Sequence, residues 1–126
     1  MMSAVEKKPA IRVLVVEDDR VSRKIARMML SDLGCDVEVA DCGTEALAKS
    51  PYEYDIIFMD VGLGDMSGLD VARQIRESLA GKQVSIVALT AHAANDPVAA
   101  DAEAIDHFMC KPATYKDFEK VLDKYS

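Results

Sequence analysis

Hydrophobic residues along this chain fall into two kinds of pattern. Short continuous runs rich in Val, Ile and Leu are typical of strands buried on both faces, and strict alternation with polar residues is typical of a strand with one exposed face. The predicted strands are Ile11–Val16, Cys35–Ala40, Tyr54–Asp60, Val84–Leu89 and Asp106–Cys110. Only the second of these alternates clearly, so it is expected to be half-exposed.

Between these runs, hydrophobic residues recur at the three- and four-residue spacing of an amphipathic helix. Two predicted helices begin with the spacing of a capping box, in which a Ser or Thr and an acid three residues later bind each other's backbone N–H groups. The fourth helix has a thin apolar stripe and Pro97 in its first turn. The five helices are predicted from Val21 to Leu33, over Thr44–Ser50, from the box Ser67–Asp70 to Gly81, after Asp96, and from the box Thr114–Asp117 to Tyr125.

Regular alternation of buried strands with amphipathic helices predicts a parallel sheet covered by helices on both faces. Right-handed crossovers leave few ways to arrange five such units, and the strand order 2-1-3-4-5 is a common one. We therefore predict one α/β domain with a flavodoxin-like, doubly wound fold of five parallel strands and five helices. The domain is expected to span residues 10–126, after a flexible tail of residues 1–9.

Length and composition exclude several classes of function. A chain of 126 residues, half of them hydrophobic and 29% charged, has the size of one globular domain. The formal net charge of −7 disfavours direct contact with nucleic acid, which requires a basic face. We find no apolar run suited to a membrane span or a signal peptide, and three cysteines without a CxxC pair indicate reduced thiols. We therefore expect a cytoplasmic protein without membrane insertion.

Polar residues that suit chemistry follow four of the predicted strands. Three consecutive acids, residues 17–19 (EDD), come directly after the first strand, and like charges this close repel one another. Asp60 ends the third strand, Thr90 follows the fourth, and Lys111 follows the fifth. Because ligands bind beyond the carboxyl ends of such strands, these side chains are expected to converge at the switch point between the first and third strands.

A divalent cation explains why the acids stand together. Mg²⁺ or Mn²⁺ prefers oxygen ligands, two or three carboxylates suit it, and its charge removes their mutual repulsion. With the metal bound, one carboxylate can attack a phosphoryl group as a covalent nucleophile. Thr90 and Lys111 are then placed to hydrogen-bond or neutralise the phosphoryl oxygens. The sequence thus predicts a metal-dependent phosphoryl site at this edge of the sheet.

Four motifs, LVVEDD, DIIFMDVGLGDMSGLD, ALTA and FMCKP, resemble in order and spacing those of the receiver domains of two-component response regulators. MDVGLGDMSGLDVARQIR and ALTAHA are most similar to receivers attached to hybrid sensor histidine kinases. The resemblance covers the chain from Ile11 to about Tyr125. It implies a domain that takes a phosphoryl group from a histidine kinase or a histidine phosphotransfer protein and then switches its contacts with a downstream protein. Such a domain catalyses its own phosphotransfer and slow autodephosphorylation, and it is not a metabolic enzyme.

The resemblance also implies a role for each motif residue. The phosphoryl acceptor would be Asp60. The Mg²⁺ ligands would be Glu17, Asp18, Asp60 and the Gly62 backbone carbonyl. Thr90 and Lys111 would contact the phosphoryl oxygens, and Thr90 and Phe108 would form the switch pair. Asp19 falls outside the metal pair and is expected to cap the first helix. Gly62 and His92 lie where the family tunes the lifetime of the aspartyl phosphate, so His92→Ala is expected to change dephosphorylation more than phosphorylation. The Lys111–Pro112 peptide bond is expected to be cis.

Several positions depart from the family pattern. The family usually has proline four residues after the acceptor, where this chain has Gly64, and glycine before the fifth strand, where it has Ala104. Gly64 restricts the backbone less than proline does, so the loop beside the site is expected to be looser. The segment between Thr90 and Phe108 is slightly shorter than in hybrid-kinase receivers. The output surface is therefore expected to differ from the usual one.

Other interpretations stay open. A degenerate receiver would bind partners without phosphorylation, although the complete set of motif residues argues against it. A phosphohydrolase of the haloacid dehalogenase kind needs an acid two residues after its nucleophile, and this chain has Gly62 there. An FMN-binding flavodoxin needs Ser, Thr and Gly after the first strand, and residues 17–19 of this chain are acidic instead. His107 is expected to face solvent. The short polar start favours a free-standing receiver over a piece of a hybrid kinase.

Overall fold

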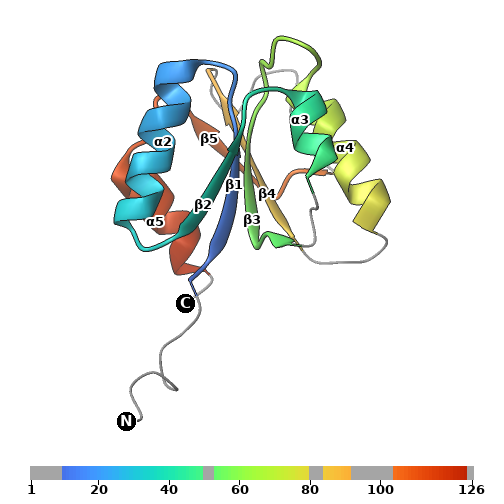
Figure 1. Ribbon diagram of the computed structural model, residues 1–126. Helices are drawn as coiled ribbons and strands as arrows, with labels where there is room; N and C mark the ends of the chain where they lie inside the picture. Colours follow the sequence, from blue (N-terminus) through green and yellow to red (C-terminus); the bar gives the residue numbers. More distant parts are fainter. Residues whose placement is uncertain (1–9, 50–52, 80–83, 92–103, 125–126) are drawn as a thin grey trace.

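The computed structural model describes residues 10–49, 53–79, 84–91 and 104–124 (Figure 1). Its strands are β1 (Arg12–Val16), β2 (Asp36–Ala40), β3 (Ile56–Asp60), β4 (Ser85–Thr90) and β5 (His107–Cys110). They form one parallel sheet in the order β2-β1-β3-β4-β5, which confirms the predicted topology. The chain goes from β1 to its neighbour β2 on one side and then crosses to β3 on the other side of β1. The switch point therefore lies between the carboxyl ends of β1 and β3.

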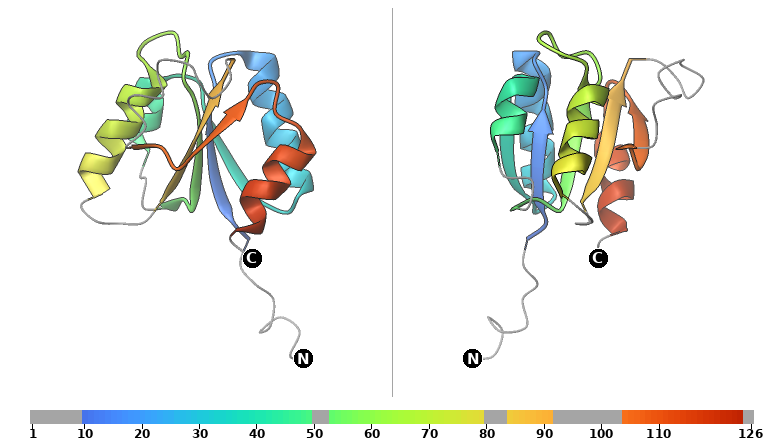
Figure 2. Two further views of the ribbon diagram at one scale, coloured as in Figure 1. Left: turned by 180° about the vertical axis from the view of Figure 1, so that it is seen from behind. Right: turned by 90° about the vertical axis from the view of Figure 1, so that its right-hand side faces the viewer.

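Helices cover both faces of this sheet (Figure 1, Figure 2). Helices α2 (Arg20–Asp32) and α5 (Tyr115–Asp123) lie on one face, and α3 (Gly43–Ala48) and α4 (Gly68–Leu79) lie on the other. These four confirm four of the five predicted helices, and the predicted helix after Asp96 lies outside the described residues. Within the described part of the chain, no helix combines the length and the apolar character that crossing a membrane requires.

Burial explains the hydrophobic pattern of the strands. All positions of β3 are buried, and so is every position of β1 and β4 except the first. These strands are central, so helices cover both of their faces and continuous hydrophobic runs result. Strand β2 lies at an edge and is mostly half-buried, in agreement with its alternating sequence.

Successive strand residues point to opposite faces, so β1 and β3 contribute to two separate cores. The core on the side of α2 and α5 includes Val13, Val15 and Phe58, and the ring of Phe118 from α5 packs edge-on against Phe58 at a centroid distance of 5.0 Å. The core on the side of α3 and α4 is built around Leu14, Val16, Ile57, Met59, Val71 and Ile75. The two strands that end in acids are therefore held from both sides.

Local signals determine where two of the helices begin. Asp19 caps α2, as predicted, because its carboxylate accepts a hydrogen bond from the Ser22 N–H at 2.8 Å. Thr114 and Asp117 form the predicted capping box of α5. At the other end of α2, Gly34 has a φ of +92°, in the left-handed region that glycine tolerates best, and it ends the helix as its position predicts.

Arg76 of α4 joins the starts of β4 and β5. Its guanidinium donates hydrogen bonds to the carbonyl oxygens of Val84 (2.6 Å) and Ala104 (3.2 Å), and it pairs with the carboxylate of Asp106. That carboxylate also accepts a hydrogen bond from the Ile86 N–H at 2.8 Å. Ala104, at the position where the family usually has glycine, is buried in the core beside α4. This end of the sheet is opposite the edge that carries the acids.

Candidate functional site

The acids, Thr90 and Lys111 meet at one edge because backbone pairing continues past the strand ends. These backbone hydrogen bonds run from Glu17 N to Ala40 O (3.1 Å), from Val61 N to Leu89 O (3.0 Å) and from Lys111 N to Thr90 O (2.8 Å). The first and third bonds place the charged residues Glu17 and Lys111 directly on the sheet, and the second holds the residue that follows Asp60. The predicted convergence of the strand ends is thereby confirmed.

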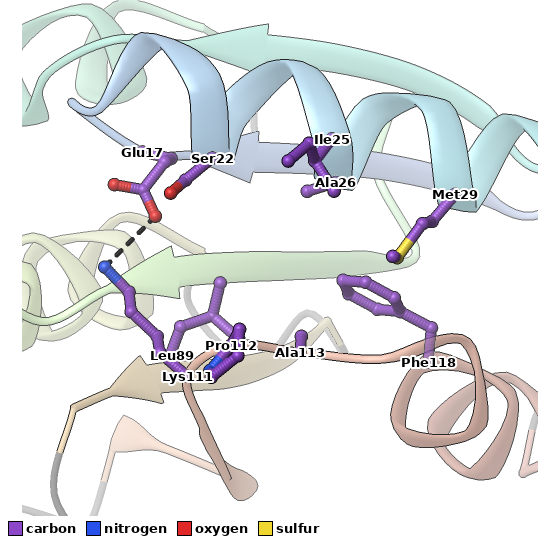
Figure 3. Close-up of a pocket in the computed structure, with 10 residues that line it drawn as sticks. All are labelled: Glu17, Ser22, Ile25, Ala26, Met29, Leu89, Lys111, Pro112, Ala113 and Phe118. Carbon is purple, nitrogen blue, oxygen red and sulfur yellow. Dashed lines mark ion pairs between the residues drawn. The ribbon is translucent and has the colours of Figure 1, made fainter.

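Lys111 lies between two buried carboxylates. Its Nζ is 2.9 Å from Oδ1 of Asp60. The same Nζ is 3.1 Å from Oε1 of Glu17, the pair that Figure 3 marks with a dashed line. Only 3% of Asp60 and 2% of Glu17 is exposed to solvent. Backbone N–H groups add to this arrangement, since Gly62 donates to Oδ1 of Asp60 and Asp19 donates to Oε2 of Glu17, both at 3.1 Å. The ion pairs compensate for the burial of the acids, which would otherwise be unfavourable.

The two buried carboxyl groups have opposite pKa shifts. Burial, and then the hydrogen bond to Asp60, raises the pKa of Glu17 to about 7. Burial also acts to raise the pKa of Asp60, but hydrogen bonds from Glu17, Lys111 and the Gly62 N–H lower it below its usual value. Two carboxylates in contact ionise together only at a high cost. Without metal, therefore, Glu17 is the member of the pair that takes up a proton first as the pH falls, and Asp60 is the more acidic one.

Lys111 stays charged beside these groups. Burial acts to lower its pKa, but the hydrogen bonds and charges of Asp60 and Glu17 outweigh burial and raise the pKa of Lys111 above its ordinary value. The site thus combines a fixed ammonium group with an ionised aspartate, two features that phosphoryl chemistry uses.

Three carboxylates are close enough to hold one metal ion. Ligand oxygens of Glu17, Asp18 and Asp60 all lie within 4.8 Å of one another. Asp18 is exposed while the other two are buried, so an ion held here would face water on one side. Hard cations such as Mg²⁺ take carboxylate oxygens and keep several waters, so this set of donors fits Mg²⁺. Asp19 points its carboxylate to the start of α2 and is not part of the cluster.

A close backbone approach fixes the loop that follows Asp60. A Cβ atom placed on Gly68 would lie 2.1 Å from the carbonyl oxygen of Asp60, so only glycine fits this position. The Gly68 N–H also donates to the carbonyl of Val61 at 3.0 Å. Sequence reasoning missed this role. Its one signal was a glycine in the first turn of a helix, where glycine is otherwise unfavourable.

The family model of the response regulator receiver domain matches residues 13–123. The chain belongs to this family. Hybrid signal transduction histidine kinase L of Dictyostelium discoideum is 34% identical over 122 residues, which cover 90% of this chain and 7% of that kinase. The aerobic respiration control sensor protein ArcB of Escherichia coli (strain K12) is 34% identical over 119 residues, which cover 93% of this chain and 15% of the sensor. The chain thus spans a small fraction of either protein.

Solved receiver structures have the same fold. The CheY-like receiver domain from Methylobacillus flagellatus superimposes with a TM-score of 0.84 at 29% identity, over 94% of this chain and all of that chain. The response regulator TrrA from Thermotoga maritima, solved in complex with Mg²⁺-BeF, gives a TM-score of 0.79 at 28% identity, over 92% of this chain and 99% of that one. The expected resemblance to receivers and the flavodoxin-like fold are both confirmed.

The remaining predicted residues of the receiver lie near this centre or outside the described chain. Thr90 is buried at the end of β4, and Phe108 lies on the neighbouring strand with 36% of its surface exposed. The Lys111–Pro112 peptide bond is cis, as predicted. His92 lies outside the described residues. His107, expected to face solvent, is half-buried, and its ring lies 3.0 Å from Nζ of Lys124.

A groove leads from the receiver site along α2. Its volume is about 310 Å³. The residues that line it are Glu17, Ser22, Ile25, Ala26, Met29, Leu89, Lys111, Pro112, Ala113 and Phe118. Figure 3 shows the Glu17–Lys111 pair at one end and the side chains of Met29 and Phe118 at the other. The groove was not predicted, because it depends on the distance between α2 and the segment that leads into α5.

Proposed function

We propose that this receiver accepts a phosphoryl group on Asp60, with Mg²⁺ or Mn²⁺ bound, from a phosphohistidine of a histidine kinase or a histidine phosphotransfer protein. One observation carries the proposal: a buried, ionised aspartate ends β3, with an ammonium group 2.9 Å away and two further carboxylates around it. Buried acids are unfavourable unless charged partners compensate for them. A divalent cation and a phosphoryl group are suitable partners for this cluster.

In the proposed reaction, a carboxylate oxygen of Asp60 attacks phosphorus. A P–O bond to Asp60 forms, the P–N bond to the donor histidine breaks, and the electron pair returns to the imidazole nitrogen, which takes up a proton. The low pKa of Asp60 keeps this nucleophile ionised. Lys111 balances negative charge on the phosphoryl oxygens. Glu17, Asp18, Asp60 and the Gly62 carbonyl would hold Mg²⁺, whose positive charge would balance the negative charge of the group in transfer.

We propose that the signal then passes through Thr90 and Phe108. The Thr90 hydroxyl would hydrogen-bond the phosphoryl oxygen and vacate space, and the partly exposed ring of Phe108 on the adjacent strand would turn inward. A charge that favours one of two arrangements shifts their populations, and the contacts with a downstream protein change accordingly. Gly62 and His92 are proposed to set the lifetime of the aspartyl phosphate.

Helix α2 offers a surface on which the phosphoryl donor can dock. Val21, Ile25 and Met28 are exposed and spaced as i, i+4 and i+7, so they form one apolar row. Such a row suits the apolar face of a partner helix. Because α2 starts directly after the acids, a histidine on the docked partner helix would face Asp60. We place this reaction in the cytoplasm, in keeping with the three cysteines of the described residues, none of which forms a disulfide.

The test is intact mass after incubation with acetyl phosphate, with and without Mg²⁺. We expect one phosphoryl increment in the parent protein, none in Asp60→Asn, and a higher Mg²⁺ requirement in Asp18→Asn. Asp19→Asn is the matched control, because Asn caps helices well and Asp19 lies outside the cluster. A folded parent that takes no phosphoryl group from acetyl phosphate or phosphoramidate would instead indicate a module that binds partners without phosphorylation.

A further inference from the structure

Asp65 ties the loop after Asp60 to a neighbouring helix. One carboxylate oxygen of Asp65 accepts a hydrogen bond from the Gly43 N–H at 2.9 Å. The other accepts from the N–H of Thr44 at 3.0 Å and from the hydroxyl of the same residue at 2.9 Å. These donors belong to the first turn of α3, whose N–H groups have no partner within the helix. The three hydrogen bonds connect segments that are more than 20 residues apart in the chain.

The same contact is reinforced by packing beside it. A Cβ atom on Gly43 would lie 2.4 Å from Cγ of Met66, so the Met66 side chain rests directly on the start of α3. Leu63, earlier in the loop, is buried in the core on the side of α3 and α4. Residues 63–66 are thus fixed at three of their four positions. The exception is Gly64, which adds backbone freedom.

This loop carries a group of the site. The Gly62 N–H donates to Oδ1 of Asp60, and the peptide of Gly62 therefore moves with any displacement of the loop. At its far end, Gly68 is held against the Asp60 backbone. Between these two points, Asp65 makes the largest set of polar contacts to the rest of the domain that the structure shows for the loop. Its hydrogen bonds to Gly43 and Thr44 lower the pKa of Asp65 to about 2, so it accepts them as a carboxylate at neutral pH.

We propose that Asp65 is a positioning residue for Mg²⁺ binding and phosphoryl transfer at Asp60. By fastening the loop to α3, it holds the Gly62 peptide beside Asp60 in spite of the freedom that Gly64 introduces. Groups that orient metal ligands without touching the metal commonly change its affinity when they are removed. This inference rests on the proposed function for the identity of the ion and of the reaction.

A purely structural role for Asp65, as a cap of α3, predicts a different result. The control is Glu45, whose carboxylate accepts from the Asp41 N–H at 2.6 Å at the start of the same helix. Within the described residues, the hydrogen bonds of Glu45 join it to Asp41 and Cys42 and not to the loop of residues 61–67. Glu45→Ala therefore weakens the same helix end without releasing the loop.

The experiment measures Mg²⁺ affinity by calorimetry and by titration of the Gly62 amide resonance in the parent, Asp65→Ala, Asp65→Asn and Glu45→Ala proteins. We expect Asp65→Ala to weaken Mg²⁺ binding about tenfold, and Asp65→Asn, which keeps one acceptor oxygen, to weaken it less. Glu45→Ala should lower the melting temperature but keep the Mg²⁺ affinity of the parent. At saturating Mg²⁺, the rate of phosphorylation by acetyl phosphate should also fall in Asp65→Ala.

Equal Mg²⁺ affinity in the parent and in a folded Asp65 variant, or equal losses in Asp65→Ala and Glu45→Ala, would overturn the inference. If Asp65→Ala does not fold, Asp65→Asn decides between the same outcomes. The parent protein separates this inference from the proposed function. A parent that binds Mg²⁺ but accepts no phosphoryl group contradicts phosphoryl transfer, while the comparison of Mg²⁺ affinities still tests the role of Asp65.

Discussion

Replacing Glu17 by Gln should stabilise the metal-free receiver at alkaline pH and much less at acid pH. Glu17 is buried, and its pKa is raised from an ordinary value of 4.5 to about 7, by burial first and by the contact with Asp60 second. A group whose pKa is raised in the folded state stabilises the fold below the unfolded-state pKa and loses this contribution as pH rises through the folded-state pKa. For Glu17, the loss extends from about pH 4.5 to about pH 7.

The size of the effect follows from the shift itself. At about 1.4 kcal/mol for each pKa unit, the move from 4.5 to about 7 corresponds to roughly 3 kcal/mol of unfolding free energy. Most of it, roughly 2–3 kcal/mol, is lost between pH 5 and pH 8. Asp60 does not offset this loss, because its pKa is lowered and it is ionised in both states across that range. Gln stays neutral, so Glu17→Gln avoids the cost of ionising a buried acid.

Urea denaturation followed by circular dichroism, in EDTA at several pH values between 5 and 8, measures this effect. The stability of Glu17→Gln relative to the parent should rise by roughly 2–3 kcal/mol across the range. Glu38→Gln is the control, because a hydrogen bond from Tyr54 lowers the pKa of Glu38 and no such rise is expected. A difference between Glu17→Gln and the parent that stays constant from pH 5 to pH 8 would refute the reasoning.

Two pairs of substitutions test backbone contacts, one beside the site and one at the opposite end of the sheet. Gly68→Ala forces a Cβ to within 2.1 Å of the Asp60 carbonyl oxygen and should destabilise the fold by more than about 2 kcal/mol in urea denaturation, whereas Gly62→Ala, whose Cβ would lie 3.9 Å from Asp60 Oδ1, should be far milder. Arg76→Met removes the guanidinium that two carbonyl oxygens and Asp106 contact and should cost about 1–2 kcal/mol. Arg73→Met removes an exposed ion pair and should cost less than about 0.5 kcal/mol. Comparable losses in the two members of either pair would contradict the assigned contacts.

Burial decided which parts of the fold the sequence could predict. β1, β3 and β4 are covered on both faces, so their hydrophobic runs are continuous and their existence was predictable. The ends of these strands were less predictable than their existence. β3 starts at Ile56 rather than Tyr54, and β4 includes Thr90. The register of hydrogen bonds sets these limits, and hydrophobicity alone does not reveal it.

The candidate site was predictable to the extent that strand ends define it. Glu17, Asp60 and Lys111 each follow or end a strand, and parallel strands bring such residues to one edge. Contacts between loops could not be predicted in this way. The hydrogen bonds of Asp65 to Gly43 and Thr44 depend on how the loop after β3 meets the start of α3, which no periodic pattern in either segment specifies.

Local capping was predicted only in part. The expected box at Ser67 and Asp70 takes another form, because the Ser67 hydroxyl accepts from the Leu69 N–H at 3.2 Å and Asp70 pairs with Arg73. Cys42, a weak hydrogen-bond acceptor, caps α3, which begins at Gly43 rather than at the predicted Thr44. Several side chains compete for the free N–H groups of a helix, and tertiary packing decides between them.

The backbone bonds that carry the site also determine how it responds to thermal motion. The amides of Glu17, Val61 and Lys111 are bonded to the sheet beyond the formal strand ends, and Val61 directly follows β3, whose positions are all buried. Amides bonded to a buried strand exchange with solvent mainly when a whole cooperative unit opens, and loops open far more often. The Asp60 carboxylate, at the end of β3, therefore belongs to a slowly opening part of the domain. Brief local fluctuations leave it shielded, and regulation has to act through side chains and loops around a sheet that stays closed.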